Sequence, residues 1–310
     1  MNRRRPTLRI GSVALAATVL LIVVGGYTRG SGSGYGCADR WPLCEGGLLG
    51  GWLPRADFNM VVEWSHRWLA AVVGILVLAT AVSAWRHHRS DRVVPLLATL
   101  VVVTIVFQAW LGRAVVQGAL AADLVSAHLA ISLLAAALLV AVVVLIRFDP
   151  GSDQKPDRSW LILVAGGAGA VFAVILAGSA VHNLFFPGWP LMFDRLVPEL
   201  QSAPAVWHFV HRAAAGIYAA LAVVLWTEAR RRGRPGHEVA MLGTAAVLYL
   251  VNIVVGAAHV ATEVGSAALV ATHLGLAAAV WLLTVAAAVS TARLGSEVHH
   301  GSTRKVEWVT

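Results

Sequence analysis

Eight long apolar runs separated by short polar segments make up most of this chain. They lie at about 8–28, 63–85, 94–113, 124–146, 159–182, 204–228, 238–258 and 267–291. A run of about 20 apolar residues is what an α-helix needs to cross a bilayer. The pattern therefore predicts eight transmembrane helices in an all-α polytopic membrane protein.

Composition supports this interpretation, because 58% of the 310 residues are hydrophobic and only 13% are charged, with a mean hydropathy of +0.73. These values lie well outside those of soluble domains. The longest segments between the runs are 29–62 and 183–203, and neither is long enough for a separate soluble catalytic domain. The first run is too long for the core of a signal peptide, so we interpret it as a membrane span.

The net charge of +8 could indicate a nucleic-acid partner, but the basic residues follow the membrane pattern instead. With the N-terminus placed inside, 17 of the 24 Lys and Arg residues lie in the inner segments and the two termini. Basic residues concentrate in cytoplasmic segments of membrane proteins. The sequence therefore predicts a multi-pass protein of the cell membrane with both termini in the cytoplasm, surrounded by lipid and without a nucleic-acid partner.

Two windows of the chain repeat at a single offset of 145 residues. His66 and Arg67 align with His211 and Arg212, and His128 aligns with His273. The matched pairs indicate a tandem duplication, and four spans per half keep the two halves in the same orientation. We therefore expect two tandem four-helix bundles related by an internal parallel repeat, formed by residues 1–150 and 151–310.

The repeated histidines suggest bound cofactors. An ionisable residue inside a membrane helix is costly and usually functional, although a single buried histidine is more often a hydrogen-bonded core residue. Two imidazoles on facing helices of a bundle suit the axial positions of a haem iron. Zinc is less suitable, because neither half supplies a third convergent ligand. Arg67 and Arg212 are candidates for binding haem propionates, or they extend to lipid headgroups.

The two halves differ at one position beside the histidines. Glu63 lies one turn before His66, whereas the equivalent residue of the second half is His208. A carboxylate beside one site and not the other suggests that one site does chemistry and the other moves electrons. Alternatively, Glu63 is an acidic residue favoured near the start of a helix.

Several motifs together give the chain a resemblance to the haem A synthase family. They are Gly25-Gly26-Tyr27-Thr28-Arg29, the pair Cys37 and Cys44, Glu63-Trp64-Ser65-His66-Arg67, His128, His211-Arg212 and His273. The similarity extends over nearly all eight spans, and the cysteine pair is similar to that of a bacterial subgroup.

The resemblance implies an oxidoreductase that converts the C8 methyl of haem O into a formyl group by successive hydroxylations, giving haem A for terminal oxidases. It implies haem b held by His211 and His273 in the C-terminal bundle. The substrate haem O would face His66 and His128 in the N-terminal bundle, with Glu63 as the candidate catalytic residue. A haem O synthase, which is a farnesyltransferase, and the assembly of terminal oxidases would be its partners.

The cysteines Cys37 and Cys44 enclose six residues of an outer loop, on the oxidising side, where a disulfide is expected. Such a disulfide could be a structural staple or have a redox role. Two other classes of protein compete with the synthase. A dihaem b-type membrane cytochrome would carry electrons through the four histidines without needing Glu63. A transporter built on a parallel repeat would need neither the matched histidines nor haem.

Overall fold

The computed structural model describes residues 4–148, 157–181, 188–192, 195–263 and 265–296. Within these ranges the chain forms eight long α-helices and one short 3₁₀ turn, Leu49–Gly51. The helices are α1 (Arg4–Gly30), α2 (Phe58–His87), α3 (Val93–Gln117), α4 (Ala122–Arg147), α5 (Arg158–Val181), α6 (Ala203–Arg231), α7 (Gly236–Ala261) and α8 (Ala267–Ser296). Every one is long and apolar enough to cross a membrane, which confirms the predicted all-α membrane fold.

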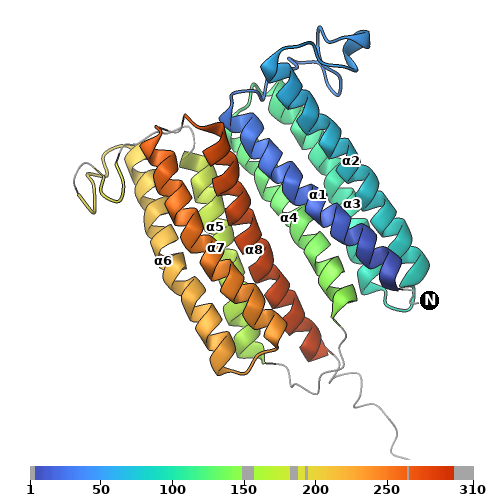
Figure 1. Ribbon diagram of the computed structural model, residues 1–310, viewed down its shortest axis with the longest axis vertical. Coiled ribbons are helices and arrows are strands. Elements are labelled where there is room, and N and C mark those ends of the chain that lie inside the picture. Colours follow the sequence, from blue (N-terminus) through green and yellow to red (C-terminus); the bar gives the residue numbers. More distant parts are fainter. Residues whose placement is uncertain (1–3, 149–156, 182–187, 193–194, 264, 297–310) are drawn as a thin grey trace, which may run out of the picture.

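Each half of the chain closes into a ring of four helices (Figure 1). Helix α1 packs on α2, α2 on α3, α3 on α4, and α4 returns to α1. Helices α5, α6, α7 and α8 repeat this order. We call the end of the molecule that carries the segment 31–57 the loop end. The boundary expected between residues 150 and 151 lies outside the described residues.

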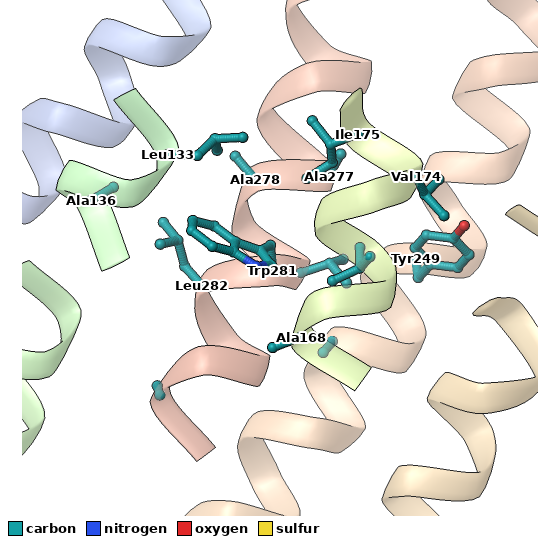
Figure 2. Packing of buried hydrophobic residues seen from close by; sticks show 14 of the residues in the cluster. Leu133, Ala136, Ala168, Val174, Ile175, Tyr249, Ala277, Ala278, Trp281 and Leu282 are labelled. Carbon is teal, nitrogen blue, oxygen red and sulfur yellow. The ribbon is translucent and has the colours of Figure 1, made fainter. Parts of the chain in front are cut away.

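The two bundles meet along a seam in which α8 packs against α1 and α4. Helix α8 contacts both α1 and α4, while α5 touches α4. In the most apolar windows of α8 and α4, 56% and 44% of the residues are buried, against 17% for α6. Figure 2 shows Trp281 of α8 at the centre of this packing, among small side chains such as Ala277 and Ala278. Small residues let helix backbones approach closely within a membrane, so the seam holds the bundles together.

Two pairs of corresponding helices in the two halves begin at the same spacing. Helices α2 and α6 start at Phe58 and Ala203, 145 residues apart, and each is capped by the preceding side chain. Asp57 accepts the N–H of Met60 at 2.9 Å, and Ser202 accepts that of Ala205 at 3.4 Å. Such caps satisfy N–H groups that the first helical turn leaves free. Helices α4 and α8 also start 145 residues apart. These matched starts support the proposed internal repeat.

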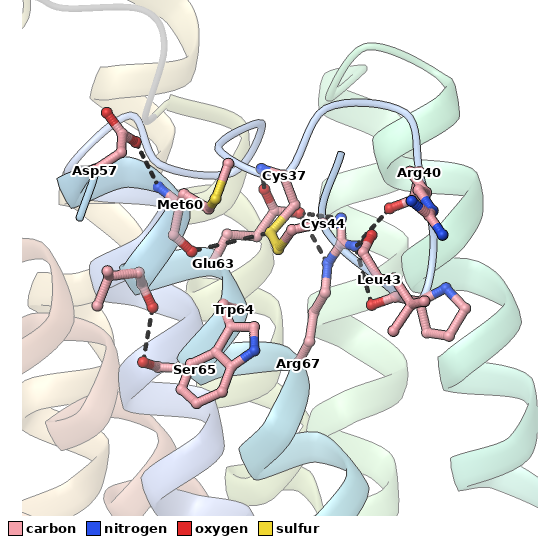
Figure 3. Close-up of a disulfide and its surroundings, with 12 residues drawn as sticks. Cys37, Arg40, Leu43, Cys44, Asp57, Met60, Glu63, Trp64, Ser65 and Arg67 are labelled. Atoms are coloured by element: carbon pink, nitrogen blue, oxygen red, sulfur yellow. Dashed lines mark hydrogen bonds and ion pairs between the residues drawn. A yellow bond between two sulfur atoms is a disulfide. The ribbon is translucent and has the colours of Figure 1, made fainter. Parts of the chain in front are cut away.

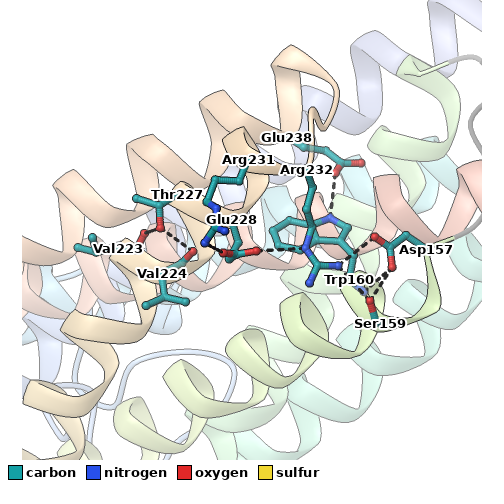
Figure 4. Close-up of polar contacts among 10 residues, drawn as sticks. All are labelled: Asp157, Ser159, Trp160, Val223, Val224, Thr227, Glu228, Arg231, Arg232 and Glu238. Atoms are coloured by element: carbon teal, nitrogen blue, oxygen red, sulfur yellow. Dashed lines mark hydrogen bonds and ion pairs between the residues drawn. The ribbon is translucent and has the colours of Figure 1, made fainter.

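A polar cluster ties three helices together at the end opposite the loop end (Figure 4). The carboxylate of Glu238, on α7, is fully buried and accepts from Trp160 Nε1 at 3.2 Å and from Arg234 Nε at 2.9 Å. Asp157 caps α5 and binds Arg232 of the segment after α6. The Trp160 N–H, the Ser159 hydroxyl and Arg232 together lower the pKa of Asp157 to about 2. This cluster lies far from the repeated histidines.

Candidate functional site

The four repeated histidines lie at one level, close to the loop end. His66 and His211 are each eight residues after the first residue of their helices, and His128 and His273 are each six residues after theirs. At a rise of 1.5 Å per residue, the four histidines lie about 9–12 Å along the helix axis from the first residues of their helices. Both halves therefore present a pair of imidazoles on alternate helices of a four-helix ring.

Each imidazole lies against a glycine on the preceding helix. A Cβ atom built on Gly25 or Gly112 would lie 3.1 or 3.3 Å from Cε1 of His66 or His128. In the second half the corresponding distance is 2.9 Å for both pairs, namely Gly178 with His211 and Gly256 with His273. Glycine is needed at these four positions because any larger residue would press on the ring.

The histidines of the C-terminal bundle are held in a defined orientation. His211 Nδ1 lies 3.1 Å from the carbonyl oxygen of Val174, and His273 Nδ1 lies 3.2 Å from that of Asn252. A carbonyl only accepts, so each Nδ1 carries the proton and donates it. This leaves Nε2 of both rings with a free lone pair, the arrangement found in metal-binding histidines.

The histidines of the N-terminal bundle lack this support. Nδ1 of His66 and of His128 is buried and has no hydrogen-bond partner. Beside His128, the amide of Gln108 donates to the His128 carbonyl at 2.9 Å and also to Ser132, while its own carbonyl oxygen is buried without a partner. Buried polar groups are normally paired, so this bundle contains buried polar atoms that the described residues leave without hydrogen-bond partners.

The predicted disulfide is present and is fixed to the carboxylate of Glu63 (Figure 3). Cys37 and Cys44 are fully buried, and the Cys37 N–H donates to Glu63 Oε2 at 2.6 Å. Glu63 is only 3% exposed and also forms an ion pair with Arg67, one turn further along α2. The carboxylate therefore joins α2 to the disulfide loop.

Arg67 completes this network. Its Nη1 lies within hydrogen-bonding distance of three carbonyl oxygens of the loop, those of Arg40 at 2.8 Å, Leu43 at 3.0 Å and Pro42 at 3.3 Å. In the second half, Arg212 Nη1 donates to the Gly188 carbonyl at 2.6 Å. Both arginines thus bind the loops that cover their bundles. Their role as propionate ligands remains a prediction.

The geometry restricts the kind of metal centre that the site can form. Within the described ranges no group of three or more His, Cys, Asp or Glu side chains could hold a metal ion. A haem brings four ligands of its own and needs only two axial imidazoles, so the paired histidines and the glycines beside them fit a haem better than a bare ion.

Comparison with known proteins agrees with this chemistry. Residues 53–285 match the profile of the cytochrome oxidase assembly protein family, COX15-CtaA. This chain belongs to that family. The match covers seven of the eight helices and all four histidines, and it confirms the resemblance inferred from the sequence motifs.

Several relatives within the COX15-CtaA family carry the name haem A synthase. The protein of Symbiobacterium thermophilum is 32% identical over 237 residues, which cover 72% of this chain and 76% of that protein. Those of Bacillus licheniformis and Alkalihalophilus pseudofirmus are 29% and 28% identical. They cover 68% and 79% of this chain, and 74% and 84% of their own lengths.

Of the four glycines beside the histidines, only Gly25 belongs to a motif that the sequence pattern singled out. The four glycines lie on odd-numbered helices, and Gln108 and Asn252 each lie four residues before one of them. Gly112 and Gly256 are 144 residues apart, close to the offset of the histidines. Extending the comparison of the two halves into α3 and α7 would have found this pair.

We expect Arg67 to hold the disulfide loop in place. In Arg67→Gln, loss of the ion pair and of the donors to the loop should increase amide hydrogen exchange of residues 37–44 by about tenfold, because hydrogen bonds to charged groups stabilise by about 1.5–3 kcal/mol. Arg113→Gln is the matched control, since Arg113 is exposed near the end of α3. Equal exchange in both variants would mean that the disulfide alone orders the loop.

Proposed function

We propose that this protein is a haem A synthase, which oxidises the C8 methyl group of haem O to a formyl group. The observation that carries the proposal is its membership of a family in which the relatives above bear that name, together with paired histidines in both bundles. At the coarser level, it is a haem-modifying oxidoreductase of a multi-pass membrane family. A pure electron carrier is not favoured, because it would not need the Glu63 network.

In this proposal the C-terminal bundle holds the resident haem b. His211 and His273 would be its axial ligands, because both rings already donate Nδ1–H to a backbone carbonyl and leave Nε2 free. Bound haem supplies a reversible one-electron couple. The protein contributes the fixed orientation of the two rings and, at Gly178 and Gly256, the absence of side chains that would crowd them.

The N-terminal bundle would receive haem O as substrate. His66 and His128 have unpaired Nδ1 atoms and are therefore not fixed by backbone carbonyls, which suits a group that enters and leaves. Glu63 is the acidic residue that we assign to the reaction. Its carboxylate is ion-paired with Arg67 and accepts the Cys37 N–H, so its position is fixed.

The proposal includes orientation and partners. We infer from the concentration of basic residues in the segments opposite the loop end that both termini lie in the cytoplasm and the disulfide outside. A haem O synthase would supply the substrate, and the product would be passed to the assembly of terminal oxidases. The domains would be residues 1–150 on the substrate side and 151–310 on the haem b side.

Crowding the imidazole of His211 should remove haem b. In Gly178→Ala the new methyl group would lie 2.9 Å from the ring, so the haem content of the purified protein should fall several-fold, as it should in His211→Ala and His273→Ala. Gly166→Ala, on the same helix but with nothing within 4 Å of the added methyl group, should retain full content. The pyridine haemochrome spectrum measures this, and full content in both histidine variants would refute the ligand assignment.

Charge at Glu63 should be required for conversion but not for haem b binding. Glu63→Gln, co-expressed with a haem O synthase, should make haem A at least ~10²-fold more slowly, because it loses a charged group in a low-dielectric site. Its haem b should remain, and Glu228→Gln at the opposite end serves as the control. Mass analysis of the extracted haems gives the result. Normal haem A formation by Glu63→Gln would make Glu63 a structural anchor of the loop only.

The proposed orientation can be tested on the disulfide. Cys37 and Cys44 should resist a membrane-impermeant maleimide in intact cells and react after mild reduction. The cysteines are the only two in the chain, so labelling is unambiguous. If the cysteines were labelled in denatured protein but not in intact, reduced cells, two explanations would remain. Either the loop end lies in the cytoplasm, or the buried cysteines are inaccessible to the reagent. Permeabilised cells distinguish these two cases.

A further inference from the structure

Arg29 is a half-buried cation that the network around Glu63 does not use, and its Nη1 atom is buried. It lies in the last turn of α1, four residues after Gly25, the glycine that contacts the ring of His66. Residues four apart share one face of a helix. Arg29 therefore lies on the face of α1 that lines the N-terminal histidine pair, one turn nearer the loop end than Gly25.

The neighbouring face of α1 is closed by α8. A Cβ atom on Gly26 would lie 3.0 Å from Leu274, and one on Gly30 would lie 3.0 Å from Ala267 and Val270. Such close approach leaves no space for a long side chain on that side. Arg29 thus lies in the last turn of α1, with the α8 seam on one side and the face of the histidine pair on the other.

Nη1 of Arg29 is buried and makes no hydrogen bond to the described part of the chain. An arginine cannot lose its charge under ordinary conditions, and a buried polar atom without a partner is unfavourable. Arg67, the other arginine near His66, is already bound to Glu63 and to loop carbonyls. Nη1 of Arg29 is therefore available to an anionic ligand.

We propose that Arg29 binds a propionate carboxylate of the haem that faces His66 and His128. This inference rests on the proposed function, which places haem O in the N-terminal bundle. A carboxylate matches the planar, bidentate donor geometry of a guanidinium. Its place one turn beyond Gly25, the glycine that contacts the ring of His66, directs the carboxylate edge of the haem toward the loop end. A lipid phosphate offers similar oxygen ligands and is the other source of such an anion.

The test compares haem O with its dimethyl ester, in which both carboxylates are neutral. The probes are titrated into purified protein that retains its haem b, in a maltoside detergent free of phosphate, and binding is followed by difference absorbance. Wild type should bind the diacid at least tenfold more tightly than the diester. Arg29→Gln should lose this preference by binding the diacid more weakly, with the diester unchanged, and Arg113→Gln should behave as wild type.

A preference for the diacid that persists in Arg29→Gln overturns the inference. The inference is also overturned if wild type and Arg29→Gln bind the diacid equally in this detergent and differ only when phospholipid is present. That result would identify a lipid phosphate as the ligand. If Arg29→Gln fails to retain haem b, Arg29→Lys decides. Loss of the bidentate geometry in this variant must then weaken binding of the diacid more than binding of the diester. Wild-type affinities of Arg29→Lys for both ligands refute the proposal.

The outcome is separable from that of the proposed function. A wild type that prefers the diacid through Arg29 but forms no haem A on co-expression supports the propionate site and refutes the synthase. A wild type that forms haem A while Arg29→Gln keeps its preference supports the synthase and refutes the propionate site.

Discussion

A polar group inside a membrane-spanning bundle has no water to bind, and this constraint organises the loop end of the molecule. Lipid surrounds the outer faces of the helices, so each buried polar side chain must find a partner within the protein or in a ligand. Glu63 finds Arg67 and the Cys37 N–H, and His211 and His273 find backbone carbonyls. Among the described residues, Nδ1 of His66, Nδ1 of His128 and Nη1 of Arg29 find none and belong to the N-terminal half, while Oδ1 of Asn252 is left unpaired in the C-terminal bundle.

The same constraint supports the different roles that we propose for the two bundles. In the C-terminal bundle backbone carbonyls accept from Nδ1 of His211 and His273, so both proposed ligands are already oriented. In the N-terminal bundle the corresponding atoms are unpaired, and energy gained by pairing them is available to a group that binds there. A preorganised site suits a resident cofactor, while an incompletely satisfied one suits a substrate whose binding must be reversible.

The disulfide loop also acquires a clear structural role. Its backbone supplies the Cys37 N–H to Glu63 and three carbonyls to Arg67. The loop therefore holds the carboxylate of Glu63 in position, and the Glu63–Arg67 pair in turn holds the loop. The disulfide closes the segment in which these groups lie, so a change at either cysteine acts on Glu63 through this network.

Much of the fold followed from local properties of the chain. Hydropathy located all eight helices to within a few residues, because a lipid-facing span must be apolar along its whole length whatever its neighbours are. The offset of 145 residues located the histidine pairs, and the difference between Glu63 and His208 distinguished the halves. Family membership, too, could be recognised from the motifs around Cys37, Glu63 and the histidines.

By itself, then, the sequence determined the helices, the depth of the histidines and the asymmetry at Glu63, since each depends only on position along the chain. The tertiary structure decided which groups these side chains contact. Glycines opposite the imidazoles, Arg67 bound to the disulfide loop and Arg29 left without a counter-ion all depend on helix rotation and on the path of the loop. Rotation is set by packing between helices that are distant in the sequence, and hydropathy carries little information about it because nearly every face of these helices is apolar.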